Sequence, residues 1–256
     1  MKILLVVPTY YPAFKFGGPI FQIHHLSKFL LKNKIRVTVC TTDMGNKENV
    51  NSNVMEIVEG VEVFYFGRLF PKFYLSARMF FFLLRNINKY ELIHIHSIFN
   101  FPTAISLALS ALFKKKIILS PRGILDKELI ENKNTISKKI WLYLFKKILS
   151  QKVKVFHATT ELEKEKIKFY YKNSNIRVIS NGVDINYLLK EPKNNDLNSE
   201  YIKYFNKKNN LLYLGRIDRK KNIDLIIKSI SKANLSNFNL NIVGSGDKKY
   251  LNDIYN

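Results

Sequence analysis

The segment LLYLGRIDRKKNIDLIIK, residues 211–228, is the part of this sequence that decides the fold. An apolar, strand-like run leads through Gly215 into Arg216, and a helical pattern opens just past Lys221. In an open parallel α/β sheet, ligands bind at the carboxyl ends of the strands, where helix N-termini offer unpaired N–H groups. The segment therefore predicts a diphosphate site with Arg216 and Lys221 as its cations. The alternative is an ordinary solvated helix start with surface cations.

Strand-like and helical patterns alternate along the rest of the chain, which is typical of a parallel sheet with helices on both faces. Strands are expected at residues 3–7, 37–41, 61–65, 92–96, 116–120, 155–158, 177–179, 211–217 and 238–243. Helices are expected at 20–31, 103–113, 135–149, 161–170 and 222–233, with a further aromatic helix between 68 and 90. The predicted fold class is α/β with doubly wound parallel sheets.

The pattern divides the chain into three parts. Residues 1–175 are expected to form an N-terminal Rossmann-like domain, 176–210 a polar connecting segment, and 211–256 the start of a second α/β domain. Parallel strands are normally buried on both faces, which two strands and about one and a half helices cannot achieve. The second domain is therefore expected to be incomplete in this chain.

The composition is that of a globular, strongly basic protein. The 256 residues are 46% hydrophobic and include 42 Lys and Arg against 20 Asp and Glu, a formal charge of +22. A single cysteine, Cys40, excludes a disulfide framework and favours a reducing, cytoplasmic location. The apolar start MKILLVVP is too short for a signal peptide, and no run of about 20 apolar residues predicts a membrane span.

The positive charge favours an anionic partner such as nucleic acid, a membrane surface or a phosphorylated substrate. Two segments, 68–90 and 138–154, combine aromatic with basic residues and suit helices that have an apolar and a basic face. The simpler interpretation is a helix packed on the core with a solvated basic side. The alternative is an interfacial helix on anionic lipid, which would make the protein peripheral on the inner face of the cytoplasmic membrane.

Several motifs, taken in order, resemble the GT-B glycosyltransferases of family 4 over essentially the whole chain. The motifs are PTYYP (8–12) with GGP (17–19), LIHIHS (92–97), SPRG (120–123), ATTE (158–161), VISNGVD (178–184), LGR (214–216) with Lys221, and IVGSGD (242–247). The resemblance implies two Rossmann-like domains, the second incomplete here. It also implies transfer of a sugar from a nucleotide-sugar donor to a glycan or lipid-linked acceptor, with retention, in the synthesis of cell-surface polysaccharide or lipopolysaccharide.

The resemblance assigns roles to individual residues. Arg216 and Lys221 would neutralise the departing diphosphate without a metal, an electrostatic effect that often dominates catalysis. The expected catalytic residues are His96, Arg216 and Lys221. The expected donor-binding residues are Gly18, Gly215, Arg216, Lys221, Gly244 and Gly246, and the expected acceptor-binding residues are Gly17, Gly18, His96 and Arg122. The nucleotide-sugar is a substrate, and no cofactor or metal is expected.

The sequence departs from the family pattern at two points. Arg122 stands where many members have the His of a His-Gly pair, and the acidic motif that holds the donor sugar and ribose would follow Asn256. Two alternatives are therefore open: an inactive, truncated remnant of a transferase, or a basic membrane- or nucleic-acid-binding protein without catalysis. The aromatic residues form no RNA-binding signature, so nucleic acid is not an expected partner.

Two further motifs give weaker hypotheses. His94 and His96 share one face of a strand and would suit a metal, but no carboxylate or cysteine accompanies them at a suggestive spacing. The GSG at 244–246 follows a strand and begins like a dinucleotide fingerprint, but Lys249 occupies the third glycine position. A metal site and a dehydrogenase are therefore not expected.

Overall fold

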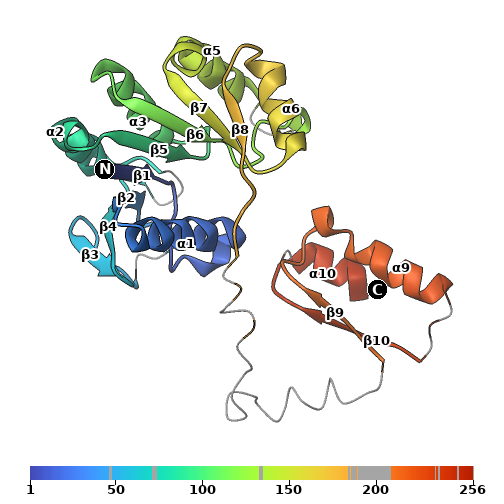
Figure 1. Cartoon of the computed structure of the whole chain (residues 1–256). Coiled ribbons are helices and arrows are strands. Elements are labelled where there is room, and N and C mark those ends of the chain that lie inside the picture. Colours follow the sequence, from blue (N-terminus) through green and yellow to red (C-terminus); the bar gives the residue numbers. More distant parts are fainter. Residues whose placement is uncertain are drawn as a thin grey trace. The chain divides into compact units, whose positions relative to one another are not determined.

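The computed structural model describes residues 1–45, 48–70, 74–132, 135–183, 185, 189, 209–233, 235, 237–246 and 248–255. The chain divides into two compact units, Met1–Asp184 and Ile185–Asn256 (Figure 1). Both units combine parallel strands with helices, which confirms the predicted fold class.

An eight-stranded sheet forms the centre of the first unit (Figure 1). Its strands, in spatial order, are β3 (Met55–Val58), β4 (Val61–Phe66), β2 (Arg36–Thr42), β1 (Lys2–Val6), β5 (Leu92–His96), β6 (Lys116–Ser120), β7 (Val153–Ala158) and β8 (Ile176–Val178). Only the pairing of β3 with β4 is antiparallel. The chain fills one side of β1 first and the other side from β5 onward, so the carboxyl ends of β1 and β5 flank a topological switch point.

Helices cover both faces of this sheet. They are η1 (Phe14–Phe16), α1 (Gly18–Lys32), α2 (Ala77–Asn86), η2 (Ile87–Lys89), α3 (Phe101–Leu112), α4 (Lys127–Asn132), α5 (Thr135–Gln151) and α6 (Glu161–Tyr170). α1 packs on β2 and β4 over one core cluster, whereas α2, α3, α5 and α6 pack over the other. Right-handed crossovers explain this division, because connections that lead away from β1 in opposite directions lie on opposite faces.

Polar caps decide where several of these helices begin. The side chains of Ser76, Asn100 and Thr160 each accept a hydrogen bond from the backbone N–H three residues further on. The cap at Ser76 starts α2 well inside the aromatic segment 68–90, whose residues Lys72 and Phe73 lie outside the described part of the chain.

The first unit differs from the sequence prediction at two strands. β8 lies in the expected connecting segment but pairs with β7, so this unit extends beyond residue 175 to Asp184. β3 was not predicted: Glu59 and Gly60, with φ of 46° and 87°, form a tight turn that returns the chain antiparallel along β4. Most of the expected connecting segment, 190–208, lies outside the described residues.

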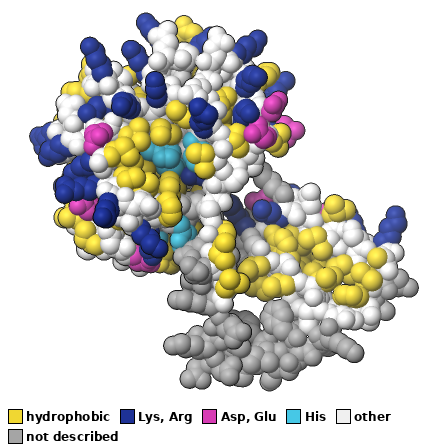
Figure 2. All heavy atoms as spheres, viewed as in Figure 1, with side chains coloured by type: hydrophobic (Ala, Val, Ile, Leu, Met, Phe, Trp, Pro, Cys, Tyr) yellow, Lys and Arg dark blue, Asp and Glu magenta, His cyan; other side chains and the backbone are white. Residues whose placement is uncertain are grey.

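The second unit contains a two-stranded parallel sheet of β9 (Asn210–Leu214) and β10 (Asn239–Val243). Its other described elements are η4 (Arg219–Lys221), α9 (Ile223–Lys232) and α10 (Lys248–Tyr255). The buried core consists of Ile217, Ile223 and Tyr250. Leu212, Leu214 and Val243 are exposed, so one face of this sheet has no cover within the described residues; Figure 2 shows many hydrophobic side chains on the surface of this unit.

We expect amide hydrogens of β9 and β10 to exchange faster than those of β1, β2 and β5. The strands of the first unit are buried under helices, whereas the small core of the second unit protects only one face of its sheet. Hydrogen exchange followed by mass spectrometry measures this difference. Equally slow exchange in both sheets would contradict the expectation.

Candidate functional site

Residues predicted for the acceptor side lie at the carboxyl edge of the first sheet, beside the switch point. His96 is the last residue of β5, and Arg122 follows β6 in the next loop. Gly17 directly precedes α1, and Gly18 is the first residue of that helix. The fold thus brings these segments to one edge of the sheet, and their role in acceptor binding stays a prediction.

Arg122 connects His96 to the segment that follows β8. Its Nε and Nη2 donate to His96 Nδ1 at 3.3 and 3.2 Å, and its Nη1 donates to Asn181 Oδ1 at 2.8 Å. An arginine can only donate, so Nδ1 of His96 is the acceptor and the ring proton is on Nε2. This buried Nε2 has no partner within the described residues.

A second chain of hydrogen bonds runs across the ends of three neighbouring strands. Nε2 of His157 donates to the carbonyl of Ile179 at 2.8 Å, so its Nδ1 accepts from Ser120 Oγ at 2.9 Å. Ser120 Oγ in turn accepts from Nε2 of His94 at 2.8 Å. The chain fixes the tautomers of both imidazoles and holds the backbone just before Asn181.

The histidines occupy the sheet face opposite to α3. On β5, Ile93 and Ile95 belong to the core under the helices, so His94 and His96 point to the other side. Figure 2 shows histidine side chains (cyan) at the surface of this unit, surrounded by hydrophobic ones.

Burial keeps these imidazoles neutral. Desolvation, together with the nearby His157 and Arg122, lowers the pKa of His94 to about 3. Burial also places the pKa of His96 well below its usual range, with His94 and Arg122 as additional causes, and it lowers the pKa of His157. At neutral pH, the positive charge of this cluster is therefore carried by Arg122.

The loops at this edge have an unusual backbone. Positive φ angles occur at Gly17 (72°), Ser97 (74°), Phe99 (63°), Arg122 (60°) and Gly123 (74°). Non-glycine residues rarely adopt this region, and such conformations concentrate at functional sites. They persist only where the surroundings hold them in place.

Glu163 supplies part of this support. Its buried carboxylate accepts hydrogen bonds from Gly123 N at 2.6 Å, from Thr159 N at 2.7 Å and from Thr159 Oγ1 at 2.8 Å. The loops that follow β6 and β7 are thereby joined, and the backbone of the Arg122 turn is fixed.

There is open space beside Gly18, where the loop from β1 leads into α1. A Cβ atom at Gly18 would meet no atom within 4 Å, so the packing of the chain does not itself demand a glycine there. Gly17, with φ of 72° and ψ of −150°, adopts a backbone conformation that favours glycine. The open space is compatible with a ligand that approaches the backbone closely.

Donor-side residues predicted from the sequence lie in the second unit, at the end of β9. Gly215 follows the strand, the exposed Arg216 comes next, and Lys221 ends η4 just before α9. Arg219 forms an ion pair with Asp253, and its guanidinium lies 5.3 Å from the Tyr250 ring. Arg216 and Lys221 have no acidic partner in the described part of the chain, so their N–H groups are available to an anion.

The start of α9 is less open than the sequence suggested. The hydroxyl of Tyr250 accepts hydrogen bonds from Ile223 N at 3.0 Å and Asp224 N at 3.3 Å, and it donates to Asp224 Oδ1 at 2.7 Å. The expectation that these helix N–H groups are unpaired is therefore wrong. A diphosphate here would be held mainly by side chains.

Gly244 and Gly246 have a clear structural cause. A Cβ at Gly244 would lie 1.8 Å from the carbonyl oxygen of Gly215, and one at Gly246 would lie 1.8 Å from that of Ile217. The backbone N–H groups of Gly215 and Ile217 donate to the carbonyls of Val243 and Ser245, each at 3.0 Å. The glycines let the chain segments after β9 and β10 run side by side; their role in donor binding stays a prediction.

Sequence reasoning missed His157, Ser120 and Asn181, which complete the network around His96 and Arg122. A signal was present, because His96 and Ser120 end their strands and His157 is the penultimate residue of β7. Polar residues at the carboxyl ends of adjacent parallel strands meet at one edge of the sheet. Among the described residues, no three His, Cys, Asp or Glu side chains form a group that could hold a metal ion.

Comparisons with known proteins agree with this architecture. The profile of Glycosyltransferase Family 4 matches residues 16–187. A Klebsiella pneumoniae protein, described as an uncharacterized 41.2 kDa protein in the cps region, is 26% identical over 166 residues, covering 61% of this chain and 43% of that protein. The chain therefore spans less than half the length of this relative.

Solved GT-B structures show the same fold. Anabaena HepE in complex with UDP-glucose superimposes with a TM-score of 0.68 at 15% identity, covering 100% of this chain and 64% of HepE. The catalytic domain of Arabidopsis thaliana starch synthase IV, bound to ADP and acarbose, gives a TM-score of 0.59 at 12% identity, covering 100% of this chain and 70% of that domain. At these identities the similarity shows the fold alone. Because the family profile matches more than half of the sequence, the chain belongs to Glycosyltransferase Family 4.

Proposed function

We propose that this protein takes part in transferring a sugar from a nucleoside-diphosphate sugar to a hydroxyl group of a glycan or lipid-linked acceptor. The observation that carries the proposal is the pair of cations, Arg216 and Lys221, which lie at a strand-to-helix junction and have no acidic partner among the described residues, in a chain of this family. HepE was solved with UDP and with UDP-glucose, and the Klebsiella relative comes from a cps region. The HepE complexes support a nucleotide-sugar donor, and the relative from a cps region supports synthesis of a cell-surface polysaccharide.

The donor side has to stabilise the charge that develops on the departing diphosphate. Arg216 offers a planar set of N–H donors and Lys221 a compact point charge, so together they neutralise phosphate oxygens without a metal. Because Tyr250 already occupies two N–H groups at the start of α9, these two side chains carry most of the stabilisation.

The acceptor side is assigned to His96, Arg122, Gly17 and Gly18. Arg122 has five N–H donors, of which three are directed to His96 and Asn181, so two remain for acceptor oxygens within the described surroundings. The neutral imidazole of His96 avoids charge repulsion with Arg122. Retention of configuration is part of the proposal through the family resemblance.

We further propose that the first unit contacts an anionic membrane surface through α5. This helix carries exposed apolar residues at Ile136, Ile140, Tyr143 and Leu144, and the exposed Lys146 and Lys147 follow them. Spacings of three and four residues place these apolar side chains on one side of the helix. Within the described residues, no helix has the length and hydropathy needed to cross a membrane.

Removing either donor-side cation should weaken nucleotide binding. Arg216→Ala and Lys221→Ala should each lower the affinity for UDP about tenfold or more, because each loses a charge-assisted hydrogen bond to the diphosphate. Arg216→Lys should recover only part of the loss. Isothermal titration calorimetry measures these affinities, with Lys232→Ala, at the far end of α9, as the control for charge. Unchanged affinity in both variants would move the donor site elsewhere.

Unfolding should depend on pH through the buried histidines, whose neutral state the acceptor side requires. Their folded pKa values lie below the ordinary value of about 6.5, so the unfolded chain binds more protons in this range. Stability is therefore full above about pH 6.5 and falls as the pH drops toward the folded values. His94→Gln should reduce this fall by about 1.4 kcal/mol per pH unit between pH 6 and 5. Urea denaturation at several pH values measures the slope of stability against pH, and an unchanged slope in His94→Gln would contradict the assignment.

Binding to anionic vesicles should depend on α5. Replacing Lys146 and Lys147 by Gln should weaken co-sedimentation with phosphatidylglycerol-containing vesicles about tenfold or more, since a cation near a charged surface contributes roughly 1 kcal/mol. The matched control replaces Lys32 and Arg36, which lie near the end of α1 and the start of β2, by Gln. Equal losses in both variants, or equal binding to neutral vesicles, would exclude α5 as the contact surface.

A further inference from the structure

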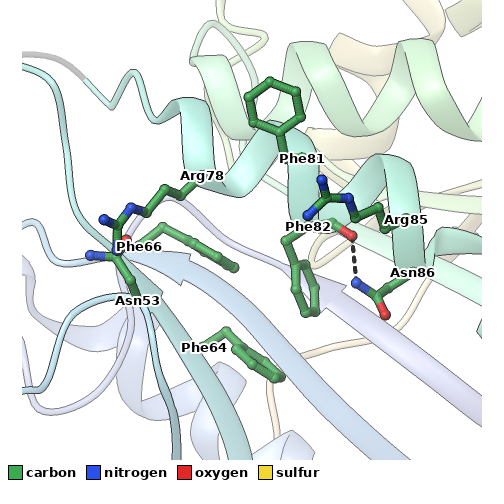
Figure 3. Close-up of a pocket in the computed structure, with 8 residues that line it drawn as sticks. All are labelled: Asn53, Phe64, Phe66, Arg78, Phe81, Phe82, Arg85 and Asn86. Carbon is green, nitrogen blue, oxygen red and sulfur yellow. Dashed lines mark hydrogen bonds between the residues drawn. The ribbon is translucent and has the colours of Figure 1, made fainter.

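A cavity of about 410 Å³ lies between α2 and the edge of the first sheet (Figure 3). None of the residues discussed for sugar transfer lines it. Its lining residues are Asn53, Phe64, Phe66, Arg78, Phe81, Phe82, Arg85 and Asn86. The cavity therefore needs an explanation separate from the candidate site.

One wall of the cavity is aromatic. Phe64 and Phe66 are alternate residues of β4 and so share one face of the strand. The ring of Phe82, on α2, lies 4.5 Å from the ring of Phe64 and 5.2 Å from that of Phe66. Phe64 and Phe82 are only partly buried, so a hydrocarbon group placed against them would remove further apolar surface from water.

The rim of the cavity is cationic. Arg78 and Arg85 stand seven residues apart on α2, about 10 Å along the helix, at opposite ends of the opening in Figure 3. The guanidinium of Arg85 lies 6.0 Å from the ring of Phe81, and neither arginine has an acidic partner among the described residues. The segment 67–90 contains no Asp or Glu. The rim therefore favours an anion.

Two amides distinguish the ends of the opening. Oδ1 of Asn53 accepts a hydrogen bond from Gly67 N at 3.1 Å, which leaves its Nδ2 hydrogens as donors beside Arg78. Nδ2 of Asn86 donates to the carbonyl of Phe82 at 2.8 Å, which leaves its Oδ1 as an acceptor beside Arg85. Among the described lining side chains, the Arg78 end thus offers N–H donors, which phosphate oxygens require.

The surroundings of the cavity favour a lipid as the source of this phosphate. Phe81, which lines the opening, and Leu84, three residues further along α2, are both exposed. α2 also belongs to the same helix layer as α5, with its exposed apolar row. A soluble ligand would leave these side chains in water, whereas a membrane surface would cover them.

We propose that this cavity binds one anionic membrane phospholipid. Its phosphate lies between Arg78 and the amide of Asn53, and the first part of its acyl chain lies against Phe64, Phe66 and Phe82. The inference rests on the membrane contact proposed for α5 and adds to it a specific site for the lipid headgroup.

The test uses the full chain and dihexanoyl phosphatidic acid, a water-soluble lipid, below the concentration at which it forms micelles. Isothermal titration calorimetry should detect binding of this lipid, and inorganic phosphate should bind far more weakly. Replacing Arg78 and Arg85 by Gln should lower the affinity about thirtyfold. The matched control, Lys32 and Arg36 to Gln, removes the same charge from the other side of the unit and should bind as the unmodified protein does.

The outcomes separate the cavity from the membrane contact. The variant in which Gln replaces Lys146 and Lys147 should lose vesicle binding but still bind the short-chain lipid. This result would support the cavity as a distinct site. Equal affinity for the short-chain lipid in the Arg78/Arg85 variant and its control would overturn the cavity, even where α5 still binds vesicles. Equal binding of inorganic phosphate and the lipid would overturn it as well, because the aromatic wall would then contribute nothing.

Discussion

The reversal of strand order at β1 is the constraint on which the first unit depends. Because the sheet grows from β1 in both directions, the connections after β1 and β5 leave on opposite faces, and the loops at their carboxyl ends diverge. Backbone at such an edge cannot continue the sheet pairing, so its polar groups are satisfied by side chains instead. The Glu163 carboxylate does this for the N–H groups of Gly123 and Thr159, and the Arg122 side chain links the side chains of His96 and Asn181 at the same edge.

Charge is distributed unequally between the two units. At the candidate site of the first unit, the Arg122 guanidinium donates to the neutral imidazole of His96 and to Asn181, and these hydrogen bonds fix its orientation before any ligand binds. In the second unit, Arg216 and Lys221 are exposed, and neither forms an ion pair among the described residues. The first arrangement suits recognition of hydroxyl groups, and the second suits charge neutralisation of a diphosphate.

The sequence predicted most of the strands because parallel strands buried on both faces are short apolar runs, as in β1 and β6. The sequence did not predict β3, a short strand whose Met55 and Ile57 are exposed, although the Glu59–Gly60 turn indicates a hairpin. Contacts between residues far apart in the sequence could not be predicted from it. Tyr250 caps a helix that begins 27 residues earlier, and the link from Ser120 to His157 depends on strand register.

The phenol that caps α9 has a consequence for ligand exchange. Tyr250 supplies the hydrogen bonds that an incoming anion would otherwise provide, and α10 holds the strand-to-helix loop through the Arg219–Asp253 pair. A loop that is ordered without its ligand loses little conformational entropy on binding and needs no rearrangement to release it. In the proposed donor site, residence time would be set by a few side-chain contacts, so single substitutions at Arg216 or Lys221 should act chiefly on the rate of dissociation.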